Sequence, residues 1–172
     1  LMTSNPAITE CSDGSYLMVY KAVGKHRPMP FGGPVVHLTA TAKSPTGPFT
    51  KQMKPTFTIE GLDFPAEDPY VWCENGKFYA LVKDMKGAFT QRGKSLAMFE
   101  SDNGLDWSLA THPFAMGLEL RWESGKVEQM SNLERPQLLF EHGKPTVLLL
   151  AAGKVGENGD MECSYNVQVP LR

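Results

Sequence analysis

Glu67-Asp68-Pro69-Tyr70-Val71-Trp72 is the clearest of three similar segments in this chain, each with a polar residue directly before a proline and apolar residues after it. The other two segments are Asn5-Pro6-Ala7-Ile8 and Glu134-Arg135-Pro136-Gln137-Leu138-Leu139-Phe140. Their prolines stand 63 and 67 residues apart, and a glycine-containing turn follows each proline at a similar distance. Repetition at a nearly fixed interval predicts structural units that are stacked or arranged radially.

Each repeat carries the pattern of a small antiparallel sheet. Apolar alternation and β-branched or aromatic runs dominate, and no stretch keeps a sustained helical period. Strands are therefore predicted at 7–10, 16–22, 35–42 and 49–53, then at 70–74, 78–84, 95–100 and 107–110, and finally at 137–141, 146–151 and 165–170. Four-stranded antiparallel meanders of this kind are typical of β-propeller blades. We expect each repeated proline to end the ladder pairing, because proline has no N–H to donate.

The predicted fold is thus all-β, a single partial β-propeller domain over residues 1–172 with blades at approximately 1–62, 63–128 and 129–172. A chain of 172 residues holds about 2.5–3 such blades, whereas closed propellers use about 4–8. An open stack would leave unpaired strand edges and a half-exposed core. We therefore expect the ring to be completed by missing sequence or by a partner chain, and a homodimer if this chain is the whole protein.

The composition and the absence of several motifs narrow the function. A net charge of −2 gives no reason to expect nucleic acid or a membrane surface as a partner. The sequence has no phosphate-binding glycine loop, no Gly-x-Ser-x-Gly elbow and no His-Glu-x-x-His motif. Its three cysteines stand at no metal-type spacing. We predict no metal site and no cofactor.

The repeated segments bring polar residues to one place. Asn5, Asp68 and Glu134 occupy corresponding positions, give or take one residue, at the start of the innermost strand of each blade. In a propeller these positions meet at one mouth of the central channel. Clustered carboxylates suit glycoside hydrolysis, in which one acid donates a proton and another carboxylate activates water or stabilises a cationic sugar ring. The alternative is that Asp68 and Glu134 only cap turns beside proline.

A family resemblance adds to this reading. Residues 66–82, with the Asp68-Pro69 pair, and residues 133–138, with Glu134-Arg135-Pro136, resemble the five-bladed propeller glycosidases of the family 43-like group and its relatives, family 117 and the family 32/68 clan. The resemblance implies that Glu134 is the general acid and that Asp68 orients it or tunes its pKa. It also implies a catalytic base Asp about one blade before Asn5. A channel cation such as calcium is known in the family, with His37 as a conceivable neighbour.

Asn5 is an amide and cannot act as a base, so two functions stay open. The first is an oligosaccharide-hydrolysing enzyme that works as an oligomer or within a longer chain. The second is a non-catalytic carbohydrate-binding or interaction module without the base.

Further residues are predicted to bind substrate around the mouth. The lysines end apolar strands, where an ammonium can donate to sugar hydroxyls, and the tryptophans can stack on a sugar ring or fill the core. The predicted substrate-binding residues are Asn5, Lys21, Glu67, Trp72, Lys83, Asp84, Trp122 and Arg135.

Overall fold

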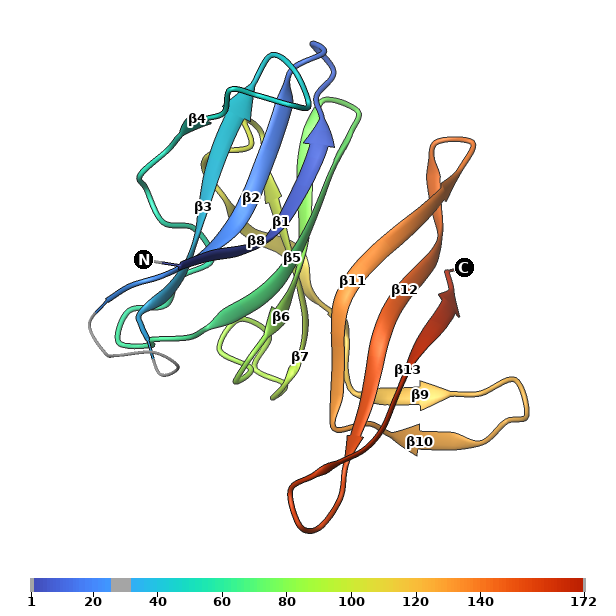
Figure 1. Cartoon of the computed structure of the whole chain (residues 1–172). Helices are drawn as coiled ribbons and strands as arrows, with labels where there is room; N and C mark the ends of the chain where they lie inside the picture. The colour runs from blue at the N-terminus through green and yellow to red at the C-terminus, as the bar shows by residue number, and fades with distance from the viewer. Residues whose placement is uncertain (1, 26–31, 172) are drawn as a thin grey trace.

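The computed structural model describes residues 2–25 and 32–171, and these residues form thirteen strands and no helix. Figure 1 shows most of the strands gathered into three antiparallel sheets. The first sheet contains β1 (Met2–Glu10), β2 (Tyr16–Val23), β3 (Val35–Ala42) and β4 (Thr50–Lys51). The second contains β5 (Ala66–Glu74), β6 (Lys77–Asp84), β7 (Ser95–Ser101) and β8 (Ser108–Met116). The third contains β11 (Asn132–Glu141), β12 (Lys144–Val155) and β13 (Met161–Pro170).

A small hairpin, β9 (Glu119–Arg121) with β10 (Val127–Gln129), joins the second sheet to the third and was not predicted from the sequence. Within each of the three sheets the strands follow chain order. This is the meander predicted for a blade, and one sheet falls in each of the three predicted blades. None of the described residues forms a helix with the length and apolar character needed to cross a membrane.

Tight turns fix the register of the first two strands in the second and third sheets. Asn75 and Gly76 have φ of 52° and 76°, and His142 and Gly143 have φ of 51° and 76°. Positive φ at both central residues is the requirement of a two-residue hairpin turn whose twist matches that of the flanking strands. Both turns lie where the sequence predicted them.

The strands continue through the repeated prolines, so the prediction that proline ends the pairing is wrong. In β5 the register with β6 passes from Glu67↔Lys83 to Tyr70↔Leu81 across an irregularity. The same break occurs between Ser4 and Ala7 in β1 and between Glu134 and Gln137 in β11. Each break sets two residues against one, which is a β-bulge. The missing N–H of proline costs nothing there, because the bulged residues make no ladder pair.

Apolar side chains fill the two spaces between neighbouring sheets. Val19 of the first sheet packs with Ala80 and Val82 of the second. Leu81, which points to the opposite face of β6, packs with Leu148 and Leu150 of the third sheet. The alternation along β6 shows that the second sheet is covered on both faces. Sheets stacked face to face in this way bring their first strands together, with β1 against β5 and β5 against β11.

The first sheet has a second apolar face, on the side away from the second sheet. Tyr20, Leu38 and Ala40 are buried there among Met18 and Phe49. Part of this face borders an open pocket of about 280 Å³. Tyr20 precedes Lys21 just as Val82 precedes Lys83, so this face corresponds to the face of the second sheet that packs on the first.

Candidate functional site

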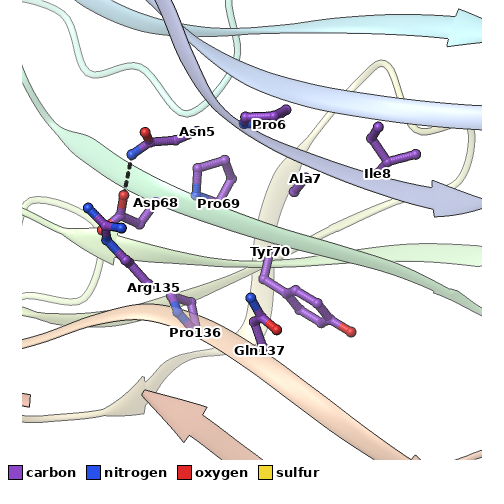
Figure 2. Close-up of a pocket in the computed structure, with 10 residues that line it drawn as sticks. All are labelled: Asn5, Pro6, Ala7, Ile8, Asp68, Pro69, Tyr70, Arg135, Pro136 and Gln137. Atoms are coloured by element: carbon purple, nitrogen blue, oxygen red, sulfur yellow. Dashed lines mark hydrogen bonds between the residues drawn. The ribbon is translucent and has the colours of Figure 1, made fainter. Parts of the chain in front are cut away.

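Three bulge residues lie close together where the inner strands begin. Asn5, Asp68 and Arg135 have φ of 49°, 50° and 53°, and each directly precedes its proline. Asn and Asp enter this left-handed region more readily than other side chains, so Arg135 is the least expected of the three. Together with the prolines they line a pocket of about 340 Å³, shown in Figure 2. A pocket of this volume falls within the range of small-ligand sites.

The third repeat is offset by one residue from the sequence-based alignment. We expected Glu134 to take the place of Asp68, whereas Arg135 takes it. Glu134 has instead the place of Glu67, one residue before the bulge. The physical reason is that the proline fixes the position of the bulge, and in the third repeat the acid stands two residues before the proline.

Asp68 supplies a carboxylate to the lining of the pocket and is buried, with 6% of its surface exposed. The amide of Asn5 donates a hydrogen bond to its Oδ1. Burial raises the pKa of Asp68, and the negative charge of Glu67 raises it further. Arg135 and the bond from Asn5 act in the opposite direction, and Glu134 adds a smaller upward effect. The structure thus brings Asp68, Asn5, Arg135 and Glu134 into one electrostatic neighbourhood.

A row of alternating charges, Lys21, Glu67, Lys83 and Glu134, crosses the three sheets beside this pocket. Lys21 Nζ lies 2.7 Å from Glu67 Oε1, and Lys83 Nζ lies 2.5 Å from Glu134 Oε1. Lys83 Nζ is also 3.9 Å from Glu67 Oε2. Each lysine stands on the second strand of one sheet and reaches a glutamate on the first strand of the next. Of the predicted substrate-binding residues, Lys21, Glu67 and Lys83 therefore gather with Glu134.

Asp84 has a different position from the one predicted. It is fully buried, and its carboxylate accepts hydrogen bonds from the backbone N–H groups of Ala88, Phe89 and Thr90 at 2.9–3.0 Å. The Thr90 hydroxyl donates a further bond. These donors occupy the carboxylate, so Asp84 shapes the loop after β6 and presents no exposed oxygen to a sugar. The sequence gives no sign of this folded-back loop.

Both tryptophans also lie outside the pocket. Trp72 has 7% of its surface exposed and stacks with Tyr70 and Tyr79 at centroid distances of 5.9 and 5.3 Å. It belongs to the core between the second and third sheets, which is the packing alternative. Trp122 follows β9, and its indole N–H donates to Glu128 Oε2 at 2.9 Å. Trp122 lines a different pocket, formed with β13.

Sequence reasoning missed Gln137 as a pocket residue. Ala7, Tyr70 and Gln137 each follow the repeated proline, and all three line the pocket with it. The signal was therefore present in the repeat itself, one position after the proline. Tyr70 also donates a long hydrogen bond, 3.4 Å, to the Leu138 carbonyl across the gap between the second and third sheets.

His37 is buried in the first sheet, with 1% of its surface exposed. Burial lowers its pKa to about 4, and the nearby charge of Lys21 adds to this effect. No hydrogen-bond partner reaches its Nε2 among the described residues. Across residues 2–25 and 32–171, no group of three or more His, Cys, Asp or Glu side chains is arranged to hold a metal ion.

Comparison with known proteins gives a fold. No family model and no curated protein matches the chain. Among solved structures it is similar to an endo-1,4-β-xylanase from Bacteroides thetaiotaomicron, with 16% identity over 98% of this chain and 49% of that one and a TM-score of 0.56. It is also similar to a family 117 glycoside hydrolase from Zobellia galactanivorans, with 14% identity, 88% and 48% coverage and a TM-score of 0.58.

A third similar structure is the family 32 β-fructofuranosidase of Bombyx mori, with 14% identity over 90% of this chain and 31% of that one and a TM-score of 0.53. The fold is that of a partial β-propeller. This confirms the predicted fold class, and the neighbours are propeller glycosidases. The chain spans about half the length of the xylanase and of the family 117 enzyme, at 49% and 48%.

Proposed function

We propose that this chain forms part of a carbohydrate-active propeller that hydrolyses a glycosidic bond. In this proposal Glu134 is the general acid, and Asp68 orients it and tunes its acidity. The observation that carries the proposal is the pocket at the start of the inner strands, where Asp68 lies within electrostatic reach of Glu134. The propeller glycosidases among the similar structures support the same class of substrate.

The two carboxylates differ in their exposure to solvent. Asp68 is buried, whereas 30% of the Glu134 side chain is exposed and can reach a sugar oxygen. In the proton transfer, the O–H bond of Glu134 breaks, the proton moves to the glycosidic oxygen, and the bond from that oxygen to the anomeric carbon breaks. A water oxygen bonds to the anomeric carbon in its place and gives a proton to the base.

The base of this reaction would come from outside the described residues. Asn5 stands at the bulge of the first sheet, where its amide cannot accept a proton from water. We propose that the remaining blades, and the base with them, are supplied by a second copy of the chain or by further sequence. The apolar face around Tyr20 and Phe49 supports this proposal, because it corresponds to a face that is covered in the second sheet.

A second candidate function is carbohydrate binding without catalysis. One observation favours it: the bulge of the first sheet carries the amide of Asn5, which cannot serve as a base. Both functions use the same pocket.

Glu134→Gln separates the two functions. Turnover would be measured on 4-nitrophenyl glycosides and on xylo- and fructo-oligosaccharides, because the similar structures include a xylanase and a β-fructofuranosidase. Calorimetry with the same oligosaccharides gives affinity. Loss of turnover with affinity retained supports hydrolysis, and binding without turnover in both proteins supports the second candidate. Glu141→Gln, an exposed residue at the end of β11, is the matched control. Light scattering on the same samples tests for a homodimer.

A further inference from the structure

Lys83 is a buried cation between two sheets. Only 5% of its side chain is exposed, yet its ammonium group lies 2.5 Å from Glu134 and 3.9 Å from Glu67. A buried charge is costly unless it is paired, and the two carboxylates provide that pairing. Lys83 stands on β6 of the second sheet, whereas Glu134 stands on β11 of the third. The pair therefore joins the second and third sheets, beside Asp68 and Arg135 of the pocket.

The neighbouring carboxylate, Glu67, has a second partner. Lys21 lies 2.7 Å from Glu67 Oε1, on the oxygen opposite to the one nearer Lys83. Because Lys21 satisfies Glu67, the shorter contact of Lys83 is made to Glu134. The row of charges thus directs the ammonium of Lys83 toward one carboxylate.

We infer that Lys83 is the positioning residue of Glu134, and this inference rests on the proposed function. Its ammonium holds Oε1 of Glu134 and fixes the direction of the carboxyl group. As Glu134 gives its proton to the glycosidic oxygen, negative charge develops on the carboxylate and the fixed ammonium stabilises it.

The other charges around Glu134 act with or against Lys83. Glu67 and Asp68 on β5 are negative, and Arg135 on the same strand as Glu134 is positive. From β12 the register partner is Ala151, which carries no charge. Lys83 is accordingly the one cation from a neighbouring strand that an ion pair joins to Glu134 among the described residues.

Lys83→Met tests the inference through the separation of kcat from KM. We expect kcat on the best substrate of the panel to fall by about 10²-fold, because a misplaced reacting group costs about that much. KM and calorimetric affinity should change less than about threefold, and Lys83→Arg should restore part of kcat. Lys77→Met is the matched control, since Lys77 lies at the other end of β6 and pairs with Glu100 at 3.1 Å away from the pocket.

A crystal structure of Lys83→Met provides a measurement that needs no activity. The inference predicts that the Glu134 carboxylate leaves its position in the parent protein, and an unmoved carboxylate with unchanged kcat overturns it. If the carboxylate moves and neither protein hydrolyses any glycoside, the proposed function fails and the positioning stands. If Glu134→Gln abolishes turnover and Lys83→Met does not lower it, the inference fails and the proposed function stands. Should Lys83→Met not fold, Lys83→Gln, which keeps a polar end and removes the charge, carries the same two measurements.

Discussion

The second and third sheets place a glutamate at the same position and surround it differently. Glu67 pairs in register with Lys83 and also contacts Lys21, so two ammonium groups hold it. Glu134 has Lys83 from the neighbouring sheet, but its register partner is Ala151. The same backbone device therefore produces a glutamate paired with two cations in one sheet and one cation in the other. The comparison teaches that reactivity in this repeat depends on the strand opposite, because the bulge itself is shared.

The largest expected effect comes from removing each glutamate in turn. We expect Glu134→Gln to lower kcat by about 10²–10⁴-fold, the usual range for losing a general acid, whereas Glu67→Gln lowers it by less than about tenfold. Steady-state kinetics on the panel of glycosides would measure both. Equal losses in the two variants would remove the distinction between the two sheets.

The first sheet extends the comparison to β2 and β6. Lys21 pairs in register with His37 on β3, whereas Lys83 pairs with Leu96 on β7. In the folded protein the pKa of His37 is lowered from its ordinary value of 6.5 to about 4. Between these two pH values the unfolded chain binds a proton at His37 and the folded chain does not. Stability that is full above pH 6.5 is lost as the pH falls toward 4, by about 3 kcal/mol.

His37→Gln should remove this loss. Denaturant unfolding of the parent and the variant at pH 7 and pH 4 would give the free energy of unfolding at each pH, and the loss between the two pH values would be compared. The same pH dependence in both proteins would contradict the assignment to His37.

A lysine at position 151 would make the third sheet like the second. In Ala151→Lys the new ammonium stands opposite Glu134, as Lys83 stands opposite Glu67. The new ammonium competes with Lys83 for the carboxylate and draws it away from its position, so we expect kcat to fall by about tenfold. Steady-state kinetics on the same panel would show it. An unchanged kcat would mean that the position opposite Glu134 does not influence the acid.

The smallest expected effect concerns Asp68. Burial raises its pKa above the unfolded value of 3.8, so between these two values the folded protein binds more protons than the unfolded chain. Stability is therefore greatest below the unfolded pKa and decreases as the pH rises through the folded pKa. The Asp68→Asn variant should not show this decrease. It should be slightly more stable to heat at pH 7 than the parent and should lose activity. Thermal melts across pH would check it, and a lower melting temperature at pH 7 would count against it.

The sequence was sufficient for the sheets and for the place where they meet. The repeated prolines located β1, β5 and β11, and the pairs Asn75-Gly76 and His142-Gly143 located two tight turns. These features are local, since turn geometry and apolar alternation depend on neighbouring residues. The same repeat indicated that Asp68 would lie near Glu134.

Contacts between distant residues were beyond the sequence. The buried loop that engages Asp84 and the hairpin that carries Trp122 depend on tertiary packing. The pairing register of β1, β5 and β11 could not be predicted either, because a two-against-one pairing at the bulge shifts every later partner by one. Glu134 was matched to Asp68 because both are the acids nearest a repeated proline, although Glu134 stands two residues before its proline and Asp68 one.

A crystal structure with a bound oligosaccharide tests the central claim most directly. The oligosaccharide would be the one that calorimetry shows to bind most tightly. We predict a sugar oxygen within hydrogen-bond distance of Glu134 and a sugar ring in the pocket of the three prolines, beside Asp68. A sugar bound elsewhere, with that pocket unchanged, would contradict the account.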